Sequence, residues 1–163
     1  MFSEAMVVQP PLAPMLAKGQ SSLPRGDDWL YGEGSIDFLR GEDGRDQIRG
    51  GAGGDQIWGG RGINRIYGSY GNDHLSGGLA ADTLSGGNGA DTLTGGWDAD
   101  ILTGGRGTDK LIGNEGSDTL SGGDHADYLH GGSEDDSLEG GSGKDTLKGG
   151  SGDDKLEGND GDD

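Results

Sequence analysis

Residues 86–94 read GGNGADTLT, and this nine-residue unit decides how the chain folds. From residue 32 to residue 157 the sequence divides into fourteen such blocks without insertion or deletion, with a partial block before them and six residues after them. Position 1 is Gly in every block, position 6 is Asp in thirteen of them, and position 8 is always Leu or Ile. A fixed short period of this kind indicates a repeat architecture.

Each block predicts one turn followed by one short strand. Gly is frequent at positions 1, 2 and 4, where it permits positive φ and a close approach of backbones, so positions 1–6 favour a turn. Positions 7–9 run polar, apolar, polar, as in Thr92-Leu93-Thr94, which predicts a strand with one residue facing inward. One block cannot bury its Leu alone. We therefore expect an all-β solenoid of stacked 18-residue coils, two blocks to a coil, with Leu and Ile meeting in the middle.

Stacking of such coils sorts the position-6 residues into two columns, one at each edge of the solenoid. The first column contains Asp37, Asp55, Asp73, Asp91, Asp109, Asp127 and Asp145. The second contains Asp28, Asp46, Asn64, Asp82, Asp100, Asp118, Asp136 and Asp154.

The two Asp columns predict bound cations. Neighbouring carboxylates in a column lie about one strand spacing apart, where even water-screened repulsion is about 1 kcal/mol per pair. Ca²⁺ takes six to eight oxygen ligands in irregular geometry, whereas Mg²⁺ demands a strict octahedron, and the chain has no Cys for softer metals. We predict that all fourteen Asp residues of the two columns bind several Ca²⁺ ions together with turn carbonyls. Asn64 brings an oxygen without a charge, so we expect a weaker site there.

The repeat resembles the RTX (hemolysin-type) calcium-binding nonapeptide, G-G-x-G-x-D-x-U-x with U apolar, which residues 86–94 match at every position. The resemblance covers residues 23–163. It implies a right-handed parallel β-roll with Ca²⁺ between stacked turns. It also implies type I secretion of an unfolded chain from Gram-negative bacteria, followed by folding in extracellular calcium. The predicted function is that of a calcium-triggered folding and structural module of a secreted protein.

Some blocks depart from this pattern at position 4. Ser35, Ala80, Asp98, His125 and Glu134 stand where Gly is expected. Ala80 and Glu134 are expected to be strained if the backbone there needs positive φ, and the acidic pair Asp98 and Glu134 could instead supply a side-chain oxygen. Four blocks of the first column keep Gly at position 4 and Asp at position 6, and their turns end at Asp55, Asp73, Asp91 and Asp109. We expect the tightest calcium sites between these turns.

Composition excludes several classes of partner and function. The chain has 163 residues with a formal net charge of −18, which disfavours nucleic acid as a partner. No stretch approaches the 18 apolar residues that a membrane span needs. The motifs H-E-x-x-H and G-x-S-x-G are absent, and His74, His125 and His130 are interpreted as surface residues. We therefore expect no catalytic residues and no enzymatic activity.

The two ends of the chain receive separate interpretations. Residues 1–22 carry three of the four Pro residues and no period, so we expect a flexible leader or a small cap before the repeat domain of residues 23–163. The sequence ends within a turn at Asp163, which predicts a truncated C-terminus. An uncapped last coil also predicts end-to-end association of two copies.

An alternative function rests on the first part of the repeat region. Six of the seven Arg residues fall between residues 25 and 65, among several aromatic residues at outward strand positions. Such a surface could bind an acidic polysaccharide, and it resembles the RTX modules appended to alginate epimerases. The residues proposed for this patch are Arg40, Arg49, Trp58, Arg65 and Tyr67. The competing interpretation is that they pack against a neighbouring domain or the leader.

Overall fold

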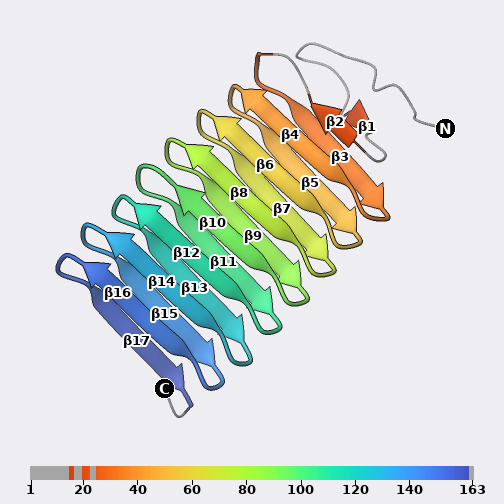
Figure 1. Ribbon diagram of the computed structural model, residues 1–163. Helices are drawn as coiled ribbons and strands as arrows, with labels where there is room; N and C mark the ends of the chain where they lie inside the picture. Colours follow the sequence, from red (N-terminus) through yellow and green to blue (C-terminus); the bar gives the residue numbers. More distant parts are fainter. Residues whose placement is uncertain (1–14, 17–19, 23–24, 162–163) are drawn as a thin grey trace.

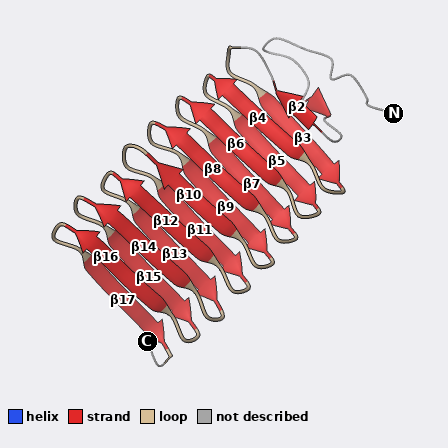
Figure 2. Cartoon of the chain, in the orientation of Figure 1, coloured by secondary structure: helices blue, strands red, loops and turns tan. Residues whose placement is uncertain are grey.

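The computed structural model describes residues 15–16, 20–22 and 25–161, and every regular element in these residues is a β-strand (Figures 1 and 2). The strands form two parallel sheets, and successive strands of the chain alternate between them. The chain therefore coils as a two-sided solenoid, as the sequence predicts. Within the described residues no helix is present that could cross a membrane.

The odd-numbered strands form a nine-stranded sheet in sequential order. Its members are β1 (Met15–Leu16), β3 (Trp29–Gly34), β5 (Gln47–Ala52), β7 (Arg65–Tyr70), β9 (Thr83–Asn88), β11 (Ile101–Arg106), β13 (Thr119–Asp124), β15 (Ser137–Ser142) and β17 (Lys155–Asp160).

The even-numbered strands form the opposing eight-stranded sheet. Its members are β2 (Gln20–Ser22), β4 (Phe38–Asp43), β6 (Gln56–Arg61), β8 (His74–Leu79), β10 (Thr92–Gly96), β12 (Lys110–Glu115), β14 (Tyr128–Ser133) and β16 (Thr146–Ser151).

The register between neighbouring strands is 18 residues throughout the repeat region. Leu93 of β10 pairs with Leu111 of β12, and Leu102 of β11 pairs with Leu120 of β13. Equivalent positions of alternate blocks therefore stack directly on one another. This confirms the predicted coil of two blocks.

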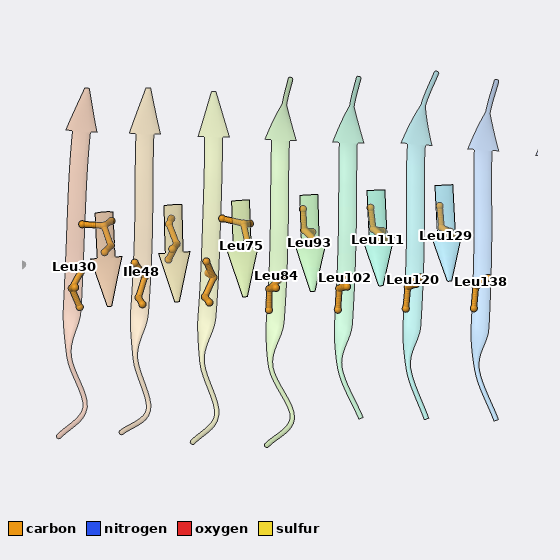
Figure 3. Close-up of a cluster of buried hydrophobic side chains, with 13 residues drawn as sticks. Leu30, Ile48, Leu75, Leu84, Leu93, Leu102, Leu111, Leu120, Leu129 and Leu138 are labelled. Carbon is orange, nitrogen blue, oxygen red and sulfur yellow. The ribbon is translucent and has the colours of Figure 1, made fainter. Parts of the chain in front are cut away.

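The core is a double file of Leu and Ile between the two sheets (Figure 3). The position-8 side chains from Leu30 to Leu138 are no more than 3% exposed, as predicted. In the last coil Leu147 is partly buried and Leu156 is 44% exposed. Each coil thus buries its apolar side chains only with the help of the coils on either side.

The strands are longer than the predicted three residues. β9 continues from Thr83 through Gly86 and Gly87 to Asn88, so positions 1–3 of the next block belong to the strand and only positions 4–6 form the turn. The prediction that positions 1–6 form the turn is wrong in this respect. The backbone of the glycine positions pairs with the next coil, and this ladder does not depend on side chains.

Positive φ is confined to positions 2 and 4 of the block. Among the described residues, ten non-Gly residues have positive φ, and each of them occupies one of these positions. No position-1 glycine has positive φ. Of the two properties expected of Gly, position 1 therefore uses only the close approach of backbones, as between Gly104 and Gly122. The expected strain is confirmed at Ala80 (φ 80°) and Glu134 (φ 71°), which adopt the left-handed region despite carrying a Cβ.

Part of the segment expected as a leader or cap has backbone structure. Met15–Leu16 pairs with β3, and Gln20–Ser22 pairs with β4, so both extend the sheets of the roll. The other residues of 1–22 lie outside the described part of the chain, as do Asp162 and Asp163 at the predicted truncation.

Candidate metal sites

The position-6 residues are buried at the two edges of the roll, where one sheet passes into the other. From Asp37 to Asp145 they are at most 4% exposed, while Asp28 and Asp154 near the ends are half-buried. The two columns are those predicted, since the turn of Asp37 joins β3 to β4 and that of Asp46 joins β4 to β5. A buried carboxylate is costly unless hydrogen bonds or an opposite charge compensate it.

One carboxylate oxygen of each inner Asp is satisfied by the preceding coil. Oδ1 of Asp73 accepts the backbone N–H of Asp55 at 2.7 Å, and Oδ1 of Asp91 accepts that of Asp73 at 2.8 Å. The same bond repeats along the other column, as from the N–H of Asp82 to Oδ1 of Asp100 at 2.6 Å. Each Asp carbonyl in turn accepts an N–H from the following coil, for example from His74 to Asp55 at 2.8 Å. The acidic turns are therefore tied to one another along each column.

The second carboxylate oxygen is buried without a hydrogen-bond partner. This holds for Oδ2 of Asp28, Asp46, Asp55, Asp73, Asp82, Asp91, Asp100, Asp109, Asp118, Asp127 and Asp136. Buried acceptors without partners are rare in native proteins and call for an explanation such as a bound ion. Their repetition along both columns indicates a repeated cation site.

The glycine at position 1 shapes a cradle around this oxygen. A Cβ on Gly104 would lie 2.6 Å from Oδ2 of Asp109 and 2.7 Å from the carbonyl oxygen of Gly122 in the next coil. A Cβ on Gly122 would meet Asp127 and Gly140 in the same way, at 2.5 Å from each oxygen. A side chain at position 1 would therefore fill the space between the carboxylate of its own turn and a peptide carbonyl of the next coil.

These oxygens fit a hard divalent cation. Carboxylate and carbonyl oxygens are the ligands of Ca²⁺, at about 2.3–2.6 Å. Among the described residues no three His, Asp or Glu side chains gather at one point. Each ion would therefore depend on turn carbonyls for most of its ligands, as the sequence predicts for glycine-rich turns.

Burial raises the pKa of most column carboxylates in the metal-free chain. The pKa rises to about 7 at Asp82, Asp91, Asp100, Asp118 and Asp127 and to about 6 at Asp46 and Asp73. Desolvation is the main cause, and the backbone hydrogen bond from the preceding coil opposes it. Protons and cations therefore compete for the same oxygens.

The five residues predicted to form one Arg/aromatic patch fall on two opposite faces. Arg49, Arg65 and Tyr67 lie on the nine-stranded sheet, where Arg49 is in register with Tyr67. Arg40 and Trp58 lie on the eight-stranded sheet, with the Arg40 guanidinium 4.8 Å from the centre of the Trp58 ring. The structure therefore does not bring all five together.

Two features of the site were not predicted from the sequence. They are the space that Gly at position 1 leaves beside the Asp and a backbone hydrogen bond accepted by Glu134. Gly at position 1 leaves room beside the Asp, and the available signal was its invariance while positions 2 and 4 vary. Oε2 of Glu134 accepts the N–H of Gly116 at 2.8 Å, so this departure does supply a side-chain oxygen, to the backbone of the preceding coil.

A family comparison agrees with this geometry. The model of the RTX calcium-binding nonapeptide repeat matches in overlapping segments at residues 25–57, 49–84, 58–93, 76–111, 103–138 and 139–163. The chain belongs to the RTX calcium-binding repeat family. RTX repeats form a structural, calcium-binding β-roll module, and RTX proteins are typically secreted. Comparison with curated proteins finds no match to the chain.

Proposed function

We propose that this RTX roll folds when its Asp columns bind Ca²⁺ and acts as a calcium-triggered structural module of a secreted bacterial protein. The observation that carries the proposal is the buried, partnerless Oδ2 repeated along both columns. A calcium-free chain must bury these carboxylates without compensation, so metal binding and folding are coupled. An extracellular module of this kind is expected to bind Ca²⁺ with dissociation constants of about 10⁻⁴–10⁻³ M.

The proposed ligands are the fourteen Asp residues of the two columns with the carbonyls of their turns. We place the tightest sites between the turns of Asp55, Asp73, Asp91 and Asp109. Each of these turns keeps Gly at position 4, namely Gly53, Gly71, Gly89 and Gly107. All four glycines have positive φ, so these turns contain no strained position-4 residue.

Secretion by a type I system follows from the same coupling. Low cytoplasmic calcium would keep the chain unfolded for export, and millimolar calcium outside the cell would fold it. The family's typical export supports this assignment.

A calcium titration tests the proposal. The full chain, stripped by chelator at pH 8, should lack the far-ultraviolet circular dichroism of a β-sheet and gain it on addition of Ca²⁺. Mg²⁺ at the same concentration should have much less effect because it requires octahedral geometry. A full sheet signal in chelator, with no rise in melting temperature when Ca²⁺ is restored, would contradict the proposal.

A second candidate function is the binding of an anionic, alginate-like polysaccharide by the nine-stranded face. On this face Tyr31, Arg49 and Tyr67 stack in register on three successive strands. A shallow groove of about 320 Å³ lies beside Arg49 and Tyr67 and is also lined by Tyr70. Arg can pair with uronate carboxylates, and Tyr can pack against sugar rings.

Affinity chromatography on alginate tests this candidate at physiological salt. Wild type should be retained, and the variant Arg49→Ala/Arg65→Ala should elute early. The variant Arg40→Ala, altered on the opposite face, is the matched control. Absence of retention of the wild type would exclude this function.

We also propose end-to-end association of two rolls through β17. Its Leu156 side chain is 44% exposed, so contact with a second copy would bury it. Sedimentation velocity in Ca²⁺ should detect dimers of the wild type that Leu156→Glu removes, and a monomeric wild type would refute the association.

A further inference from the structure

The turn of Asn64 differs from the other turns of its column in one side-chain atom, the amide nitrogen Nδ2. Asn64 is fully buried, and its Oδ1 accepts the backbone N–H of Asp46 at 3.0 Å, as an Asp would. Its Nδ2 donates a hydrogen bond to the carbonyl of Gly62 in the same turn at 2.8 Å. The flanking Asp46 and Asp82 each retain a partnerless Oδ2, whereas Asn64 has no unsatisfied side-chain atom.

The amide nitrogen occupies the place of the proposed ligand oxygen. A Cβ on Gly59 would lie 2.6 Å from Nδ2 of Asn64 and 2.6 Å from the carbonyl oxygen of Gly77. The matching distances for Gly104 run to Oδ2 of Asp109 and the carbonyl of Gly122, at 2.6 and 2.7 Å. An –NH₂ group has no lone pair to offer a cation and points its hydrogens into the site.

The orientation of the amide is fixed by its two partners. Rotating it by half a turn would set Nδ2 against the N–H of Asp46 and Oδ1 against the carbonyl of Gly62. That would place donor against donor and acceptor against acceptor. The nitrogen therefore stays on the side of the Gly62 carbonyl and keeps its hydrogen bond to that oxygen.

We propose that the Asn64 turn is a metal-independent turn that holds no cation between itself and the turn of Asp82. The Asn64 amide closes the turn through the Gly62 carbonyl and removes one negative charge between Asp46 and Asp82. The second column of sites is thereby divided in two, while the first column runs without interruption. This inference rests on the proposed calcium binding of the other turns.

Counting bound Ca²⁺ tests the inference. Equilibrium dialysis of the full chain at saturating Ca²⁺ gives the ions bound per chain for the wild type, for Asn64→Asp, and for the reciprocal control Asp73→Asn. Asn64→Asp should bind at least one more ion than the wild type, because it restores an Oδ2. Asp73→Asn should bind at least one fewer, because it introduces the same amide into the first column.

Asn64→Ala keeps the test decisive if Asn64→Asp fails to fold. This variant should bind as many ions as the wild type, since there is no ion to lose. It should unfold at lower urea concentration in saturating Ca²⁺, since the Asp46 N–H and the Gly62 carbonyl lose their partner. A loss of one ion in Asn64→Ala, or an unchanged count in folded Asn64→Asp, would overturn the inference. If the wild type itself binds no Ca²⁺, the proposed function fails, and the inference fails with it.

Discussion

At the scale of the residue, the Asp at position 6 has two separate tasks. Its Oδ1 and its backbone link three successive coils, as Asp73 does by accepting from Asp55 and donating to Asp91. In Asp73, as in ten other Asp residues of the columns, Oδ2 has no hydrogen-bond partner and is available to a cation. An Asn can perform the first task and not the second, and the two functions of the position can therefore be separated by mutation.

Replacing Asp73 by Ala should weaken calcium-driven folding much more than replacing Asn64 by Ala. Asp73→Ala removes a proposed ligand, and the calcium concentration at the folding midpoint should rise on the order of tenfold or more, because even outer-sphere partners of metal ligands contribute that much. Asn64→Ala should leave the midpoint near that of the wild type and lower the free energy of unfolding by about 1–3 kcal/mol. Circular dichroism during calcium titration measures the midpoint, and equal shifts in the two variants would refute this ranking.

The identity of the Asp residues could be predicted from the sequence, but the function of the glycines could only partly be predicted. Composition suggests backbone freedom for every Gly, and this is correct at positions 2 and 4, where even Ala80 and Glu134 adopt positive φ. Position 1 requires Gly for another reason, because a Cβ on Gly104 would collide with Asp109. That contact is made through three-dimensional packing, and a period alone cannot show it.

At the scale of the element, each strand is stable only within its stack. Glycine disfavours strands intrinsically, so the sequence predicted strands of three residues, whereas β9 has six. The additional residues are held by backbone pairing, such as that of Gly87 with Ser69 and with Gly105. Local propensity could not predict this ladder, because its partners lie one coil away.

The stack also determines how much one core residue contributes. Leu93 is fully buried between the sheets, so Leu93→Ala should lower the free energy of unfolding in saturating Ca²⁺ by about 2–5 kcal/mol. Leu156→Ala makes the same chemical change where the side chain is 44% exposed, and its effect should be much smaller. Urea unfolding followed by circular dichroism measures both variants. Similar losses would mean that stability does not depend on the double file of Leu and Ile.

At the scale of the whole molecule, the number of blocks between two residues decides whether they meet. Alternate blocks stack in one sheet, and adjacent blocks lie in opposite sheets. Residues 18 apart stack in one sheet, as Arg49 and Tyr67 do, whereas residues nine apart, such as Arg40 and Arg49, belong to opposite sheets. The uninterrupted period therefore predicted both Asp columns correctly. The same rule, applied to the Arg and aromatic residues, would have divided the predicted patch into its two faces.

The acidity of the whole roll predicts that low pH can partly replace calcium. The pKa of Asp91 and Asp118 is raised to about 7 in the folded, metal-free chain, against an ordinary value of 3.8. The folded state therefore binds more protons than the unfolded state between these values. The stability that these two carboxyls contribute is fully present below about pH 4 and is lost as the pH rises through 7.

Thermal melts of the calcium-free chain between pH 5 and pH 8 test whether stability falls as the pH rises. The melting temperature and the sheet signal should both be higher at pH 5, since protonation removes the buried charges of both columns. In saturating Ca²⁺ the order should reverse, because the ion must displace those protons and binds more tightly at pH 8. Asp91→Asn carries a neutral amide at every pH and should show a smaller dependence in calcium-free buffer. Identical melts at the two pH values without calcium would show that the buried carboxylates do not control folding.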